Sequence, residues 1–116
     1  MPKKSEEEKS ARSLAIENAT KLASMIPLEV MREAFKSFEL LEKMVATGNP
    51  NSVTDAAVGV LATRACIRGA YLNVRINVSS LNDRAFAGNL IREGAALELK
   101  AAETEKMILE TVDTTV

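Results

Sequence analysis

The sequence predicts an all-α protein, a multihelical antiparallel bundle of four helices in a single domain covering residues 1–116. Apolar residues recur at helical spacing in four consecutive segments, and no segment shows the strict alternation typical of a strand. Aromatic residues make up 3% of the chain while apolar residues make up 47%. Its core is therefore expected to be aliphatic and alanine-rich, which suits helices that pack closely together.

The first two predicted helices meet at a proline. Helix one begins at Ser5, because Ser5 and Glu8 have the spacing of a capping box. It ends at Pro27, since proline lacks a backbone N–H and clashes with the preceding turn. Helix two runs from about Pro27, a favourable first-turn residue, to Ala46. Their predicted apolar stripes are Ala11, Leu14, Ala15, Leu22, Met25 and Ile26, followed by Met31, Ala34, Phe35, Phe38, Leu41 and Val45.

A turn separates the second predicted helix from the third. Gly48 is expected to end helix two in the left-handed conformation, and Asn49-Pro50-Asn51 turns the chain. The third helix then runs from Ser52 to Val78, with Ser52 and Asp55 at capping-box spacing.

The third helix has two contrasting faces when its residues are placed at 100° intervals. The predicted core face consists of Val53, Ala56, Ala57, Val60, Ile67, Tyr71, Val74 and Val78. The opposite face carries small and amide side chains, namely Asp55, Gly59, Ala62, Cys66, Gly69, Asn73 and Asn77. Such small residues let another helix, or a flat ligand, approach the backbone closely.

The fourth predicted helix begins near Asp83 and continues to about Thr111. Its apolar positions form one narrow stripe along the helix. The residues of this stripe are Phe86, Leu90, Leu97, Ala101, Ile108 and Val112.

The polar residues of the small face allow two interpretations. In the structural one, Asp55 stabilises the start of its helix and the amides of Asn73 and Asn77 bond to neighbouring helices. In the functional one, the two amides offer donors and acceptors to a heterocycle in a cleft, and Asp55 handles protons. Similarly, Arg64, Arg68 and Arg75 form either a solvated edge or a site for an acidic ligand or partner.

Composition argues against several classes of function. The 15 basic and 16 acidic residues form no basic stripe, so nucleic acid is not an expected partner. The longest apolar run, Ala56 to Ala62, is too short to span a bilayer, and the N-terminus lacks a signal-peptide apolar region, so a cytoplasmic protein is expected. The chain has no histidine and one cysteine, Cys66, which we interpret as a packing residue. We therefore expect no metal site.

Several short stretches, in this order, resemble one family. They are Pro2 to Lys9, Ile26-Pro27-Leu28, Gly48-Asn49-Pro50-Asn51, Thr54-Asp55, Asn73-Val74-Arg75-Ile76-Asn77, and Leu81-Asn82-Asp83 with Phe86. Together they resemble the cyclodeaminase domain of formiminotransferase-cyclodeaminase and the bacterial methenyltetrahydrofolate cyclohydrolases. The resemblance implies a multihelical homodimer that processes one-carbon groups on tetrahydrofolate. One branch cyclises the 5-formimino derivative with loss of ammonia, and the other hydrolyses the 5,10-methenyl form.

This resemblance also implies site residues. A tetrahydrofolate derivative would be the substrate, with no tightly bound cofactor. Asp55 is expected to orient the substrate or handle a proton, and Asn49 to shape the cleft mouth. Asn73 and Asn77 are expected either to contact the substrate or to support residues that contact it. Arg64 and Arg68 are expected to bind the glutamate tail of the folate.

The family's usual N-terminal portion has no counterpart in this sequence. That portion includes a glycine-rich stretch and an acidic residue, and nothing here matches either one. We therefore expect the C-terminal part of a larger cyclodeaminase-type bundle, one that forms dimers or higher oligomers and is inactive alone. The alternative is a non-catalytic helical module whose small-residue face forms a dimer contact.

Overall fold

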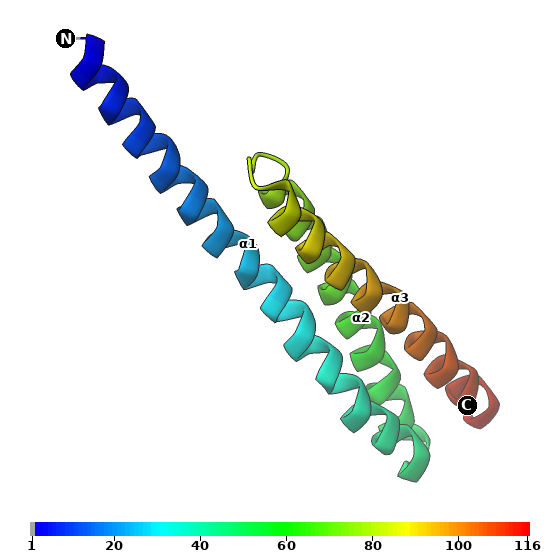
Figure 1. Ribbon diagram of the computed structural model, residues 1–116. Coiled ribbons are helices and arrows are strands. Elements are labelled where there is room, and N and C mark those ends of the chain that lie inside the picture. The colour runs from blue at the N-terminus through cyan, green and yellow to red at the C-terminus, as the bar shows by residue number, and fades with distance from the viewer. Residues whose placement is uncertain (1) are drawn as a thin grey trace.

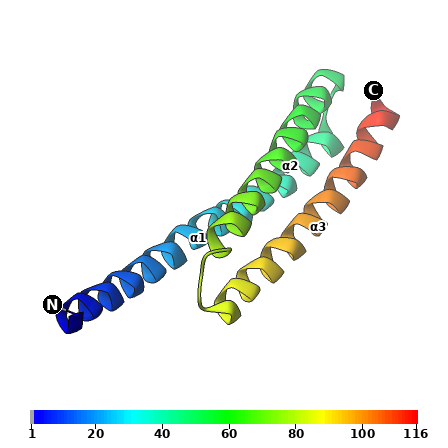
Figure 2. The same cartoon turned by 90° about the horizontal axis from the view of Figure 1, so that it is seen from above.

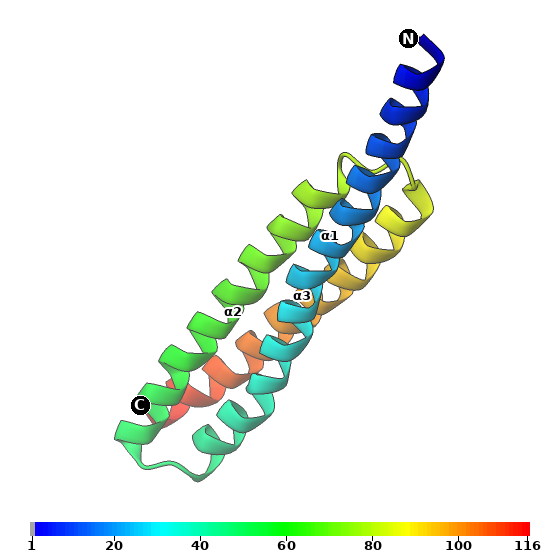
Figure 3. The same ribbon diagram turned by 90° about the vertical axis from the view of Figure 1, so that its left-hand side faces the viewer.

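The computed structural model describes residues 2–116, with side chains from Ser5 onward, as three long helices (Figure 1). They are α1 (Pro2–Thr47), α2 (Pro50–Val78) and α3 (Arg84–Thr115). Consecutive helices run antiparallel, and two short connections lie at opposite ends of the molecule (Figure 3). The described residues contain no strand, which confirms the all-α class. None of these helices combines the length and hydropathy needed to cross a bilayer.

The prediction of four helices is wrong, because α1 continues through Pro27 without a break. A proline inside a helix leaves the carbonyl four residues earlier without its amide donor. Here that carbonyl belongs to Ala23, and it accepts a hydrogen bond from Nδ2 of Asn77 at 3.3 Å. Ser24 and Leu28, on either side of the proline, are buried and hold this stretch of α1 against the core.

Both predicted capping boxes are also wrong. α1 begins at Pro2, so Ser5 lies inside the helix rather than at its start. α2 begins at Pro50, and its N-cap is Asn49, whose Oδ1 accepts a hydrogen bond from the Ser52 amide at 3.1 Å. Proline needs no hydrogen-bond partner for its nitrogen in a first turn, which explains why α2 can begin at Pro50.

The start of the last helix agrees with the prediction. Asp83 is the N-cap of α3, and its Oδ1 accepts a hydrogen bond from the Phe86 amide at 3.0 Å. At the other end α3 continues past Thr111 to Thr115.

Gly48 is required for space rather than for a left-handed conformation. No glycine among the described residues has a positive φ, so that prediction is wrong. A Cβ on Gly48 would lie 2.6 Å from the Met44 carbonyl oxygen and 3.0 Å from the Val53 side chain. The α1–α2 connection can therefore be this tight only with glycine.

The core between the helices is aliphatic, and the predicted core face of α2 is confirmed. The buried residues of that face are Val53, Ala56, Val60, Ile67, Tyr71, Val74 and Val78, with Ala57 half-buried. From the other helices the core receives Leu28, Met31, Phe38, Val45, Leu90, Ala101, Ile108 and Val112, with Ala34, Phe35, Leu41, Phe86 and Leu97 packed around it.

The predicted apolar stripe of the first helix is exposed instead of buried. Leu14, Leu22 and Ile26 are 62%, 66% and 66% exposed. The part of α1 before Glu17 projects beyond the loop that joins α2 to α3 (Figure 2), so no described helix lies against Leu14. Leu22 and Ile26 lie further along α1, and Ile26 lines the groove between α1 and α2.

Polar contacts from α1 hold the loop between α2 and α3. The two carboxylate oxygens of Glu17 accept hydrogen bonds from the backbone amides of Asn82 and Asp83, each at 2.9 Å. Lys21 Nζ lies 2.8 Å from Asp83 Oδ2 and 5.2 Å from the centre of the Phe86 ring. The backbone hydrogen bonds lower the pKa of Glu17, and the hydrogen bond from Lys21 lowers the pKa of Asp83.

These lowered pKa values predict loss of stability in acid. A carboxylate whose pKa is lower in the folded state stabilises the fold above its unfolded pKa, and this contribution disappears as pH falls through the folded pKa. Melting temperature should therefore decline below about pH 5. Glu17→Gln should flatten that decline, whereas Glu103→Gln, at an exposed position on α3, should not. Thermal melts from pH 7 to 3 test this, and identical profiles for the two variants would contradict it.

Candidate functional site in the groove between α1 and α2

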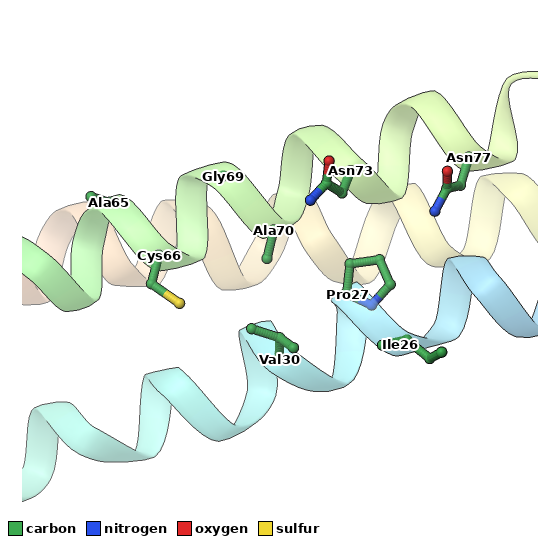
Figure 4. Close-up of a pocket in the computed structure, with 9 residues that line it drawn as sticks. All are labelled: Ile26, Pro27, Val30, Ala65, Cys66, Gly69, Ala70, Asn73 and Asn77. Atoms are coloured by element: carbon green, nitrogen blue, oxygen red, sulfur yellow. The ribbon is translucent and has the colours of Figure 1, made fainter.

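A mainly apolar groove of about 460 Å³ lies between α1 and α2. Its lining residues are Ile26, Pro27 and Val30 from α1, and Ala65, Cys66, Gly69, Ala70, Asn73 and Asn77 from α2 (Figure 4). Small-molecule sites typically enclose about 300–1,000 Å³ and combine apolar walls with a few polar groups. The groove has the size and composition of such a site.

The small-residue face of α2 creates this groove. Because Cys66, Gly69 and Asn73 recur at helical spacing, they lie on one side of the helix and face the groove. A Cβ built on Gly69 would have no atom within 4 Å, so the space beside it is empty. The opposite wall is formed by the ring of Pro27 and the side chain of Val30.

Two amides provide the polar groups of the groove. The side chains of Asn73 and Asn77 lie about one turn apart on α2, with their amide nitrogens on the side that faces α1 (Figure 4). Asn77 Nδ2 donates to the Ala23 carbonyl. Within residues 5–116, the side chain of Asn73 makes no hydrogen bond, and this residue is exposed. The structure thus brings together two of the predicted contact residues.

Cys66 lies in the groove wall and is exposed. It therefore does not pack in the core of this chain, contrary to the interpretation from sequence.

The structure separates the other predicted residues of the small face from the groove. Asp55 is exposed on the first half of α2. A helix rises 1.5 Å per residue, which places Asp55 about 16 Å along the axis from Cys66 and about 27 Å from Asn73. Asn49 lies further away still and caps the helix.

The three arginines singled out in the sequence also lie outside the groove. Arg64 and Arg68 contact Glu98 of α3, with closest N–O distances of 3.5 Å and 2.8 Å, and the Glu98 side chain is only 12% exposed. Arg75 lies over the ring of Tyr71, 5.7 Å from its centre. Arg64 and Arg68 therefore join α2 to α3, on the side of α2 away from the groove.

The α1 wall of the groove was not predicted from the sequence. Pro27 was expected to end a helix, so no groove wall was assigned to the residues around it. The available signal was the free carbonyl that a mid-helix proline creates, together with an asparagine elsewhere that could donate to it. Within the described residues, no three histidine, cysteine, aspartate or glutamate side chains gather as metal ligands would.

Comparison with known proteins identifies the family of this sequence. Residues 1–96 match the sequence profile described as Formiminotransferase-cyclodeaminase. The chain belongs to the formiminotransferase-cyclodeaminase family. This confirms the resemblance seen in the short motifs.

Members of this family with curated names include two kinds of enzyme. The chain is 39% identical to a methenyltetrahydrofolate cyclohydrolase of Methylorubrum extorquens, over 97% of this chain and 54% of that protein. It is 28% identical to the formimidoyltransferase-cyclodeaminase of Rattus norvegicus, over 91% of this chain and 21% of the relative. For the enzyme of the same name from Dictyostelium discoideum the identity is 33%, over 85% of this chain and 18% of the relative. The chain thus spans about half the length of the cyclohydrolase and about a fifth of the others.

Proposed function

We propose that this chain forms part of a folate-processing enzyme of one-carbon metabolism that hydrolyses 5,10-methenyltetrahydrofolate. The observation that carries this proposal is the 39% identity to a methenyltetrahydrofolate cyclohydrolase over 97% of the chain. A match of that extent includes the whole groove between α1 and α2.

The second candidate is the cyclisation of 5-formiminotetrahydrofolate to the 5,10-methenyl form with release of ammonia. It is favoured by the more distant similarity to the formimidoyltransferase-cyclodeaminases. Both reactions act on the same region of a folate, so one groove could serve either.

The groove suits the flat pterin ring of a folate. Pro27 and Val30 would cover one face of the ring, while the small residues of α2 let the other face approach the helix backbone. The Asn73 amide can both donate to and accept from the polar edge of the ring. Held in this way, the substrate loses much of its orientational freedom before the reaction begins.

Proton transfer requires a group that the groove lacks. No carboxylate or histidine lines it, and general acid–base catalysis needs a group within hydrogen-bonding reach of the reacting atoms. Asp55 lies beyond that reach, so we propose that it handles protons in a cleft completed by further polypeptide, with Asn49 beside the mouth of that cleft. The binding of the folate's glutamate tail by Arg64 and Arg68 stays a prediction, and both side chains also contact Glu98 of α3.

We also propose that the chain self-associates, as a dimer or a higher oligomer. Several large apolar side chains of α1 and α2 are exposed, and exposed apolar surface of this kind marks an interface where it is contiguous. They include Leu14, Leu22, Met25, Leu40, Val58, Leu61, Leu72 and Ile76.

A chimera tests the proposed reaction. In it, this chain replaces the matched portion of the Methylorubrum extorquens cyclohydrolase, and loss of the methenyl form and release of ammonia are measured with each folate. Hydrolysis of the methenyl form is expected for the chimera, and neither reaction at an enzyme-like rate for the isolated chain. A folded chimera inactive on both substrates would support the alternative of a non-catalytic helical module.

Asp55→Asn in that chimera tests the proposed proton-handling role. Asparagine keeps the shape of the side chain, and the helix-dipole contribution of the charge is only about 0.3–1 kcal/mol, so the fold should persist. Turnover should fall about tenfold or more if the carboxylate handles a proton. Full activity with an unchanged melting temperature would limit Asp55 to stabilising the start of α2.

A further inference from the structure

The two asparagines of the groove are held differently, and this difference separates their roles. Asn77 donates from its Nδ2 to a backbone carbonyl of α1 at 3.3 Å. The Asn73 side chain, about one turn earlier, has no partner among residues 5–116 and is exposed to the groove. From the sequence, the same role at the substrate site is expected for both residues.

The partner of Asn77 is a specific backbone group. The carbonyl of Ala23 is the one that Pro27 leaves unbonded, because proline has no N–H to donate four residues back along the helix. Asn77 therefore supplies from α2 the hydrogen bond that α1 cannot supply for itself. Pro27 and Asn77 both line the groove, so this bond lies at the groove wall (Figure 4).

This bond is also the polar link between the two walls. Among the described residues, it is the one hydrogen bond that joins α1 to α2; the other polar contacts of α1 reach the loop after α2, or α3. A hydrogen bond requires its donor and acceptor to stay within about 3.5 Å of each other. The bond therefore joins the two walls directly at the Asn77 end of the groove.

We propose that Asn77 is a positioning residue that sets the width of the groove through the carbonyl freed by Pro27, and that Asn73 is the amide that contacts the bound ring. The proposal deepens the proposed function, since the ring is taken to be the pterin of a folate. Asn73 has both of its amide protons and its oxygen available for the polar edge of the ring.

A thermal double-mutant cycle on the 116-residue chain tests the role of Asn77 without any ligand. Asn77→Ala should lower the melting temperature by about 2–6 °C, the effect of one lost hydrogen bond in a chain of this size. In the Pro27→Ala background the same change should have almost no effect, because the amide of the new residue bonds to Ala23 instead. An equal fall in both backgrounds would overturn the coupling. Asn73→Ala is the matched control and should leave the melting temperature unchanged.

Binding of 5,10-methenyltetrahydrofolate to the same variants tests the groove. Asn73→Ala should weaken binding about tenfold, the effect of losing one or two hydrogen bonds. Asn77→Ala should weaken it about three- to tenfold where Pro27 is present and hardly at all in the Pro27→Ala background, where the Ala23 carbonyl is already bonded within α1. Unchanged affinity of Asn77→Ala at a temperature where the variant is fully folded would overturn its positioning role.

The thermal cycle and the binding measurement test different parts of the proposal. Unchanged affinity in Asn73→Ala would overturn the contact assigned to that residue. Absence of binding by the unaltered chain would count against both that contact and the proposed function, while the thermal cycle would still decide whether Asn77 compensates for Pro27.

Discussion

Replacing Gly69 with leucine is expected to weaken binding of methenyltetrahydrofolate by about 100-fold, equivalent to about 2.8 kcal/mol, without unfolding the chain. A Cβ at this position meets no atom within 4 Å, so the new side chain fits without displacing neighbours and projects into the groove. There it would occupy the space proposed for the pterin ring. Leucine is also a better helix former than glycine by roughly 1 kcal/mol, so the melting temperature should not fall.

Ala96→Leu provides the matched control for this experiment. It adds the same side chain to an exposed position on α3 and should leave both binding and stability unchanged. Calorimetric titration and thermal melts of the two variants give both quantities. Undiminished binding in Gly69→Leu would show that folate binds elsewhere, and a large fall in melting temperature would show that other polypeptide already covers the groove.

Ile67→Ala is expected to have the largest effect on stability, about 2–5 kcal/mol. Ile67 is fully buried at 0% exposure in the middle of α2, so truncation loses apolar burial and leaves a cavity. Because small domains are stable by only about 5–15 kcal/mol, much of the variant should be unfolded in moderate urea. The free energy of unfolding from urea titrations measures the effect.

The same helix offers a matched isoleucine on its outer side. Ile76 is 67% exposed, and Ile76→Ala should change the free energy of unfolding by no more than about 0.5 kcal/mol in the monomer. If stability then depends on protein concentration in the unmodified chain but not in Ile76→Ala, the outer surface of α2 forms the proposed self-association interface. Equal losses for both substitutions at a concentration where the chain is monomeric would contradict the fold described here.

Periodicity along α2 was sufficient to predict its core face and its small-residue face. The apolar side chains from Val53 to Val78 repeat with the period of a helix, and a helix packed on one side must bury that stripe. The same reasoning failed for Leu14 and Leu22. Periodicity shows that a face is apolar, but not whether this chain contains another helix to cover it.

Local rules at the helix ends were less reliable because they consider neighbouring residues only. Asp83 caps α3 as predicted, since the bond it accepts comes from within its own turn. Pro27 did not end a helix, because the hydrogen bond it lacks is replaced by a residue fifty positions further along the chain, Asn77. Such compensation depends on tertiary structure.

The sequence by itself determined the all-α class, the core face of α2, the family, and the small-residue face of α2 that forms one wall of the groove. These properties follow from local spacing and from motifs along the chain. Tertiary structure decided that Pro27 lies inside a helix, that Asn73 and Asn77 share a groove with α1, and that Asp55, Arg64 and Arg68 lie outside it. The physical reason is that a long helix spreads one face over tens of ångströms, so only the packing of α1 against part of α2 selects which of its residues form one site.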